Sequence, residues 1–381
     1  SGLTIVNTST PVTLNNVEFA ENKAGGGGAI YGWYTNEISM KNVTFKNNTA
    51  NQHEGGAILI NGSGEDVVYI DSTTFIANVD STGPGGAIQL SNIAKASIKN
   101  SIFKENKAKA DGGGINSNDI DSLFIKNSTF DGNESMAGGG GAVSINADGT
   151  ISAYFEIKNS DFTGNKAGVL GGALWIGNSE GYIQNVGIFN NESVDNFGGG
   201  IYISENVELT MNAVTISGNS SPEPAGEGIA IDGGNIIIKN SIIWDNHIQK
   251  NSGSIDITYS NIEGGFTGTG NIDANPLFCD YWSGSWPQLA GNYHLTFLSP
   301  AIGKGENGVN MGAFDVGCDI DNSLLSVDEL IDVTPTEYAL HDNYPNPFNP
   351  TTTLRFDLPE VSDITLTIYN MLGQKVRTFN Y

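Results

Sequence analysis

The sequence contains 381 residues, of which 50 are glycine, and carries a formal net charge of −25 from 42 acidic and 17 basic side chains. Its only arginines are Arg355 and Arg377. Nucleic acids and anionic membrane surfaces require a basic surface on their partner, so the charge argues against both. No apolar run of about 18 residues is present, which argues against a membrane-spanning helix. The glycines do not recur at every third position, which excludes collagen.

A short motif of the form Gly-Gly-Ala-Ile recurs through the first two thirds of the chain, at spacings of 27 to 31 residues. A fixed period in this range is typical of a solenoid, in which each repeat buries its apolar face against its neighbours. The residue that ends each copy is Ile30, Ile58, Ile88, Ile115, Val143, Leu174, Ile201 or Ile229.

Within each repeat, apolar and polar residues alternate, as in residues 171–176 and 125–130, and this alternation is the period of a β-strand. Helical repeats are excluded because no segment shows a 3.6-residue period and a Gly pair would break a helix. Three short strands in about 28 residues fit one turn of a parallel β-helix. We therefore predict an all-β parallel β-helix of about ten coils, from Phe19 to Ile262, with a length of roughly 48 Å.

An asparagine follows three residues after an apolar side chain in each repeat, and it is never replaced by aspartate. Amides stacked one coil apart can donate to and accept from one another, whereas stacked carboxylates would repel. We therefore predict a structural Asn ladder of Asn22, Asn48, Asn78, Asn106, Asn133, Asn165, Asn191, Asn219 and Asn246. A second column, expected in the left-handed turn conformation that Asn tolerates, comprises Asn16, Asn42, Asn100, Asn127, Asn159, Asn185 and Asn240.

The position between the two apolar residues after the Gly pair is expected to face outward, and it holds aromatic residues in several coils. Trp175 and Tyr202 fall on adjacent coils, and Tyr31 occupies the same position near the other end, followed by Trp33 and Tyr34. Aromatic faces beside amides suit neutral sugars or a protein partner. We predict that these five residues form a binding site. The alternative is that they are ordinary exposed aromatic side chains with no binding role.

Catalytic residues are not evident in the repeat. The aspartates are scattered over loops, whereas inverting glycoside hydrolysis needs clustered carboxylates, and the four histidines form no column. The β-helix has no Arg to neutralise a uronate, and its acidic body would repel an anionic polymer unless calcium intervened. We therefore predict no catalytic residue and no metal site. Calcium on acidic loops is the one cofactor left open, although no calcium-binding repeat is present.

The repeat stops after Ile262, and we divide the chain into a β-helix at residues 1–272, a C-terminal cap at 273–322 and an acidic linker at 323–337. The cap is expected to cover the open edge of the last coil, which would otherwise invite aggregation. The only two cysteines, Cys279 and Cys318, lie in the cap. In an exported protein they are predicted to form a disulfide, with a pair of free thiols as the alternative.

A Pro-rich turn at residues 343–353 precedes alternating apolar residues at 354–358 and 364–368, which predicts the first strands of a small β-sandwich. With the Tyr-Asn-Met-Leu-Gly-Gln run at 369–374, this region closely resembles the C-terminal sorting domain of proteins exported by the type IX system of Bacteroidota and related Gram-negative bacteria. The resemblance implies that the type IX machinery is a partner and that the protein is secreted or attached to the outer cell surface. That domain normally continues through further strands, so residues 338–381 are expected to form part of it.

The repeat also resembles that of chlamydial polymorphic outer membrane proteins, through Gly-Gly-Ala-Ile at 55–58 and Phe-Ile-Ala-Asn at 75–78. Residues 275–314 are similar to the end of a broad class of bacterial secreted β-helix proteins. The chlamydial proteins are right-handed β-helix adhesins, so the resemblance implies a right-handed helix and a role in adhesion or recognition of glycans or of proteins on host or neighbouring cells.

Two other functions are left open. Right-handed β-helices also include polysaccharide lyases and glycoside hydrolases. A structural filament or surface-layer component is the third hypothesis, because the first coil shows no obvious cap and its edge would allow self-association.

Overall fold

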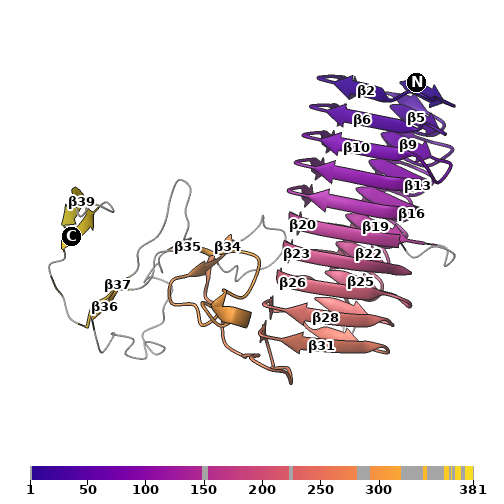
Figure 1. The fold of residues 1–381 in the computed structure, drawn as a ribbon. Helices are drawn as coiled ribbons and strands as arrows, with labels where there is room; N and C mark the ends of the chain where they lie inside the picture. Colours follow the sequence, from indigo (N-terminus) through magenta and orange to yellow (C-terminus); the bar gives the residue numbers. More distant parts are fainter. Residues whose placement is uncertain are drawn as a thin grey trace. The chain divides into compact units, whose positions relative to one another are not determined.

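The computed structural model describes residues 2–147, 153–222, 226–280, 292–318, 338–340, 356–359, 362, 365–369 and 374–380. The chain divides into two compact units, residues 1–320 and 321–381. The first unit contains an all-β parallel β-helix, as predicted, whose coils stack from β1 to β32 (Figure 1). Its right-handed sense and the finer domain boundaries remain predictions.

The coils form four columns of parallel strands, one more than the sequence predicted, although the fourth column includes only the coils from β4 to β24. The first column contains β1 (Leu3–Val6), β5 (Ile30–Trp33), β9 (Ile58–Asn61), the start of β13 (Ile88–Lys99) and of β16 (Ile115–Lys126), β19 (Val143–Asn146), β22 (Leu174–Ile176), β25 (Ile201–Ile203), β27 (Ile229–Ile231) and β30 (Ile248–Lys250). The second contains β2 (Val12–Asn15), β6 (Glu37–Lys41), β10 (Val67–Asp71), the ends of β13 and β16, β20 (Ala153–Thr163), β23 (Ser179–Phe189), β26 (Glu208–Ser217), β28 (Asn235–Lys239) and β31 (Ser254–Thr258).

The third column contains β3 (Glu18–Ala20), β7 (Thr44–Lys46), β11 (Thr74–Ile76), β14 (Ile102–Lys104), β17 (Thr129–Asp131), the ends of β20, β23 and β26, β29 (Ile242–Trp244) and β32 (Asn261–Ile262). The fourth column follows the ladder asparagine and consists of two-residue strands, namely β4 (Lys23–Ala24), β8 (Thr49–Ala50), β12 (Val79–Asp80), β15 (Lys107–Ala108), β18 (Glu134–Ser135), β21 (Lys166–Ala167) and β24 (Glu192–Ser193).

Equivalent residues of successive coils are paired in register, which places the repeated side chains directly above one another. Ile88 pairs with Ile58 on one side and with Ile115 on the other, and all three are fully buried. The Gly pair permits this stacking. Gly112 adopts φ +67°, and a Cβ on Gly113 would lie 2.3 Å from the carbonyl oxygen of Gly141 in the next coil.

The predicted Asn ladder is confirmed in the interior of the coils. Each side-chain Nδ2 donates to the Oδ1 of the next ladder asparagine at 2.8–2.9 Å, from Asn22 to Asn246. Asn106 illustrates the complete pattern, because its Nδ2 also donates to the carbonyl of Phe75 and its Oδ1 accepts from the backbone N–H of Asn78. Every buried amide of this kind is therefore satisfied only when the neighbouring coils are present.

A stack of phenylalanine rings lies beside the ladder. Successive rings from Phe19 to Phe162 have centroids 4.7–5.1 Å apart and are parallel to within 9°. The register that aligns the amides also brings these rings face to face, and burial makes them a large part of the core.

The second Asn column adopts the predicted left-handed turn. Its members have φ between +48° and +54°, and Asn127 donates to Asn100 at 3.2 Å in an exposed ladder. A turn of this kind joins the second strand column to the third, so it bends the chain at the same place in each coil.

The described residues of 273–318 pack mainly against the side of the coils. The ring of Tyr293 stacks on Phe189 with centroids 3.7 Å apart, and the backbone N–H of Ala313 donates to Thr215. The segment forms β33 (Phe278–Asp280), β34 (Asn292–Thr296), the short 3-10 helix η1 (Glu306–Gly308) and β35 (Val316–Cys318). Just before this segment, Ile272 continues the parallel pairing beyond β32 through a bridge to Asn261, and the carbonyl of Thr269 accepts from the backbone N–H of Tyr259.

The predicted disulfide stays a prediction because the side chain of Cys318 lies outside the described residues. In the second unit, β36 (Ala339–Leu340) pairs with β37 (Phe356–Asp357), and β38 (Thr365–Tyr369) pairs with β39 (Lys375–Asn380), all antiparallel. Leu354, Ile364 and the linker at 323–337 fall outside the described part of the chain.

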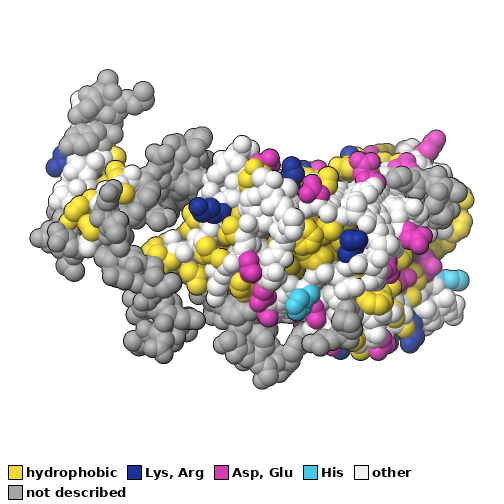
Figure 2. Space-filling model, turned by 90° about the horizontal axis from the view of Figure 1, so that it is seen from below, with side chains coloured by type: hydrophobic (Ala, Val, Ile, Leu, Met, Phe, Trp, Pro, Cys, Tyr) yellow, Lys and Arg dark blue, Asp and Glu magenta, His cyan; other side chains and the backbone are white. Residues whose placement is uncertain are grey.

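The surface carries scattered acidic side chains, with isolated lysines among them on the face drawn in Figure 2. Some of these charges pair between coils. In the fourth column Lys107 contacts Glu134 at 2.8 Å, and Lys166 contacts Glu192 at 2.9 Å. Exposed pairs of this kind contribute little to stability.

Replacing Asn106 with Asp tests the ladder. Asn106 is fully buried, so the substitution exchanges two donated hydrogen bonds for a carboxylate that faces the Oδ1 of Asn133. We expect the free energy of unfolding to fall by about 3 kcal/mol. The matched control is Asn127→Asp, which makes the same charge change in the exposed column and should cost less than about 1 kcal/mol. Urea unfolding followed by circular dichroism measures both, and equal losses would contradict the ladder's role.

Candidate binding groove

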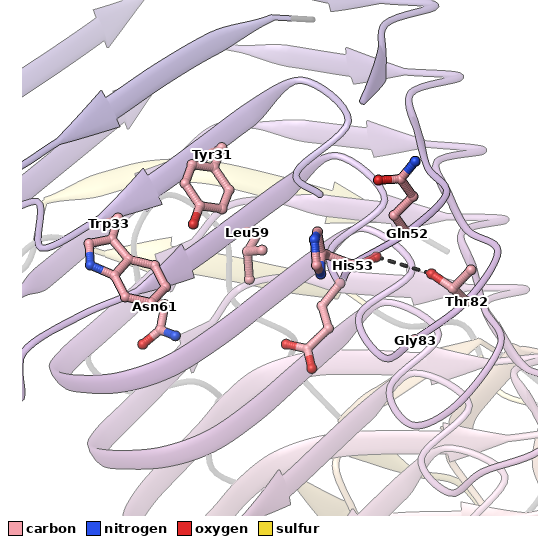
Figure 3. Close-up of a pocket in the computed structure, with 9 residues that line it drawn as sticks. Tyr31, Trp33, Gln52, His53, Leu59, Asn61, Thr82 and Gly83 are labelled. Carbon is pink, nitrogen blue, oxygen red and sulfur yellow. Dashed lines mark hydrogen bonds between the residues drawn. The ribbon is translucent and has the colours of Figure 1, made fainter. Parts of the chain in front are cut away.

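A groove of about 420 Å³ lies near the N-terminal end of the β-helix, on the outer face of the first strand column (Figure 3). We call it the aromatic groove and define it by the residues that line it, namely Tyr31, Trp33, Gln52, His53, Glu54, Leu59, Asn61, Thr82 and Gly83.

Two aromatic side chains and their partners on the next coil form one side of the groove. Tyr31 and Trp33 alternate with the inward-facing Ile30 and Gly32 on β5, so both project outward. Their ring centroids are 6.4 Å apart with an interplanar angle of 18°. Register places Tyr31 over Leu59 and Trp33 over Asn61, which puts an apolar and an amide side chain below the two rings.

Loops that follow the fourth strand column form the other side. Residues 51–54 and 81–83 run from β8 and β12 to the next Gly pair, and hydrogen bonds link the two segments as they link successive coils. Thr82 Oγ1 donates to the carbonyl of His53 at 3.2 Å, which links the two loops (Figure 3). The groove therefore has an aromatic side from regular strands and a polar side from loops of variable sequence.

Two carboxylates lie beside this polar side. Asp80 is fully buried at a position that Ala50 and Ala108 occupy in the adjacent coils, and its Oδ1 accepts hydrogen bonds from Thr82 and Gly83. Its Oδ2 has no hydrogen-bond partner among the described residues. Burial raises the pKa of Asp80, and burial followed by repulsion from Asp80 raises the pKa of Glu54.

The predicted residues near the other end are less accessible. Trp175 and Tyr202 are register partners on β22 and β25, as expected from the repeat. Tyr202 is 8% exposed, and its hydroxyl donates to Asp232 at 2.6 Å beside a shallow polar pocket. Burial and this hydrogen bond raise the pKa of Tyr202. The partly buried Trp175 packs under a loop, because a Cβ on Gly139 would lie 3.1 Å from its Cγ.

The expectation that this whole column faces solvent was wrong. Gln89, Asn116, Ser144 and Ala230 occupy the same position and are at most 7% exposed. Described loops lie against this column at some positions, because a Cβ on Gly26 would lie 3.2 Å from Leu59 Cδ2 and a Cβ on Gly139 would lie 3.1 Å from Trp175 Cγ. The spacing of the repeat does not predict which loops make such contacts. Tyr31, Trp33 and the 42% exposed Tyr34 remain accessible, with Tyr34 packed edge-on to Trp33 at 5.2 Å.

The repeat pattern did not predict His53 and Glu54 in the groove or Asp80 beside it. A usable signal existed for Asp80, because its column otherwise contains only Ala and Ser. Within the described part of the chain, no group of three or more His, Cys, Asp or Glu side chains is placed to hold a metal ion. Among the described residues, no helix is long and apolar enough to cross a membrane.

The Asp80→Asn substitution tests whether the buried carboxylate of Asp80 destabilises the folded protein at neutral pH. The amide keeps the oxygen that accepts from Thr82 and Gly83, and it removes the buried charge. Because the pKa of Asp80 is raised in the folded state, the folded protein binds the carboxyl proton more tightly than the unfolded chain does. The free energy of unfolding therefore falls as the pH rises from the unfolded pKa through the folded pKa, where Asp80 loses its proton. We expect the Tm difference, variant minus native, to increase from pH 4 to pH 7.5 in thermal melts. A difference that is constant with pH would contradict the raised pKa.

Comparison with known families supports two parts of this description. Residues 16–32 and 42–61 match the Chlamydia polymorphic membrane protein repeat, and residues 342–381 match the secretion system C-terminal sorting domain. No curated protein and no solved structure gives a significant match. The chain is thus similar to these two families over those segments, and the sorting domain and repeats together indicate a β-helix protein that is secreted or attached to the outer surface.

Proposed function

We propose that this chain is a non-catalytic recognition scaffold at the cell surface, and that the aromatic groove binds a neutral glycan. The observation that carries the proposal is the pairing of two outward aromatic rings with a polar loop wall across a groove of about 420 Å³. The similarity to a sorting domain supports a location where such a ligand is encountered.

The chemistry of the groove suits a sugar without charge. The C–H face of a sugar ring packs on aromatic side chains, and its hydroxyls need donors and acceptors in fixed positions. Tyr31 and Trp33 supply the apolar platform, while Asn61, Gln52 and Thr82 supply amide and hydroxyl groups. Glu54 and the neighbouring Asp80 disfavour an anionic ligand at this place.

The strand that carries the rings is rigid, which favours recognition. β5 is hydrogen-bonded to β1 and β9 along its length, and Ile30 is fully buried beneath it. A binding surface on such a strand needs little ordering when the ligand arrives, so less affinity is lost to entropy.

We expect Trp33→Ala to weaken binding of a neutral glycan by about tenfold or more, because a ring of the platform is removed. The measurement is a screen of neutral and acidic glycans, followed by titration calorimetry with the best neutral ligand. The control is Tyr154→Ala, which removes a 37% exposed ring from the second strand column and should leave the affinity unchanged.

Two results would count against the proposal. Equal affinity of the native protein and the Trp33→Ala variant would place the ligand elsewhere. New reducing ends or unsaturated uronate products during incubation would favour the hydrolase or lyase alternative. Light scattering of the native protein tests the filament alternative in the same samples.

A further inference from the structure

A second surface, on the outer face of the second strand column, gathers basic side chains on this strongly acidic chain. Lys99, Lys126 and Lys158 are register partners on consecutive coils, and Lys41 stands two coils before Lys99 in the same column. Lys95 lies on the same strand and face as Lys99. We call the surface the lysine face and define it by Lys41, Lys95, Lys99, Lys126 and Lys158, together with the aromatic and acidic side chains that lie between them.

Aromatic rings lie among these lysines. Lys95 Nζ lies 5.9 Å from the ring centroid of Tyr69 and 5.3 Å from that of Phe124. Further along the axis, Lys126 Nζ lies 5.8 Å from Phe124, and Lys158 Nζ lies 5.1 Å from Tyr182. Cation–π contacts hold the ammonium groups in place while leaving them hydrated on one side. Lys95, Lys126 and Lys158 are therefore positioned before any ligand arrives.

The charge on this face is positive after its internal ion pairs are counted. Lys126 and Lys158 share one carboxylate, Glu156, at 2.5 and 2.7 Å. Lys41 and Lys99 lie near Asp71, whose pKa is lowered chiefly by a hydrogen bond from Asn100. Lys95 forms no ion pair with a described residue. The face thus holds five lysines against Asp71 and Glu156, with Glu37 and Glu180 at its margins.

We propose that the lysine face binds a linear anionic polysaccharide that lies along the axis of the β-helix. Lys99, Lys126 and Lys158 repeat once per coil, at about 4.8 Å. A polymer with one carboxylate or sulfate on each sugar presents its charges at a spacing of the same order. Each ammonium would contact one acid group, and the exposed edges of Tyr69 and Tyr154 would pack against the sugar rings between them.

The arrangement favours a polysaccharide over a single-stranded nucleic acid. Nucleic acid binding of that type depends on bases stacked on open aromatic faces. On this face Tyr69, Phe124 and Tyr182 are already approached by ammonium groups, so base stacking would have to displace them. The proposal is independent of the aromatic groove, which lies on the first strand column and suits an uncharged ligand.

The test compares two double variants with the same change in net charge. Lys99→Gln with Lys126→Gln removes two charges from the lysine face, whereas Lys107→Gln with Lys166→Gln removes two from the fourth strand column. Binding of oligogalacturonate and of heparin fragments is measured by calorimetry at 50 mM salt with EDTA, which excludes calcium bridging. We expect the first variant to bind about tenfold more weakly or worse, with a shallower salt dependence, and the second to stay within about twofold.

Several outcomes are decisive. Binding of only the carboxylated or only the sulfated polymer supports the proposal and identifies the acid group. No binding of either polymer to the native protein, or equal losses in the two variants, overturns it. Tighter binding of oligothymidylate with the same lysine dependence also overturns it in favour of nucleic acid. Lys99→Gln alone, which leaves both ion pairs of Glu156 intact, keeps the test valid if the double variant fails to fold.

Discussion

The buried amide of the ladder asparagine is the group on which the rest of the fold depends. In Asn106, both Nδ2 hydrogens and the Oδ1 acceptor are used only if the coils above and below stand in one register. A shift by one residue would leave these groups unsatisfied in the core, at a cost of several kcal/mol for each coil. The same register stacks the phenylalanine rings and closes the Gly pair onto the next carbonyl.

Because the inward side chains of successive coils are in register, the outward side chains of those coils are in register too. Any outward side chain that recurs in the sequence becomes a row along the axis, so small changes in sequence create extended surfaces. Lys99, Lys126 and Lys158 form such a row, although the chain as a whole carries a net charge of −25. The charge of one surface therefore depends on which residues recur in that column. It cannot be predicted from the net charge of the chain.

The two candidate surfaces differ in how they are built. The aromatic groove needs a loop wall, formed where residues 51–54 and 81–83 arch beside β5 and β9. The lysine face needs only register, because all of its members lie on strands of the second column. One scaffold thus presents an aromatic groove with acidic side chains on the first strand column and a lysine-bearing face on the second.

The recurring parts of this protein could be predicted from its amino-acid sequence. Asn22 to Asn246 and the glycine pairs predicted the coil, the ladder and the left-handed turns, because each is a local requirement repeated about every 28 residues. The tertiary structure alone decided which outward positions are open. Trp175 and Tyr31 occupy equivalent positions, yet a loop backbone at Gly139 covers Trp175, while Tyr31 lines a groove. The path of each loop depends on contacts with its neighbours in space, such as the bond from Thr82 to His53, and these contacts leave no period in the sequence.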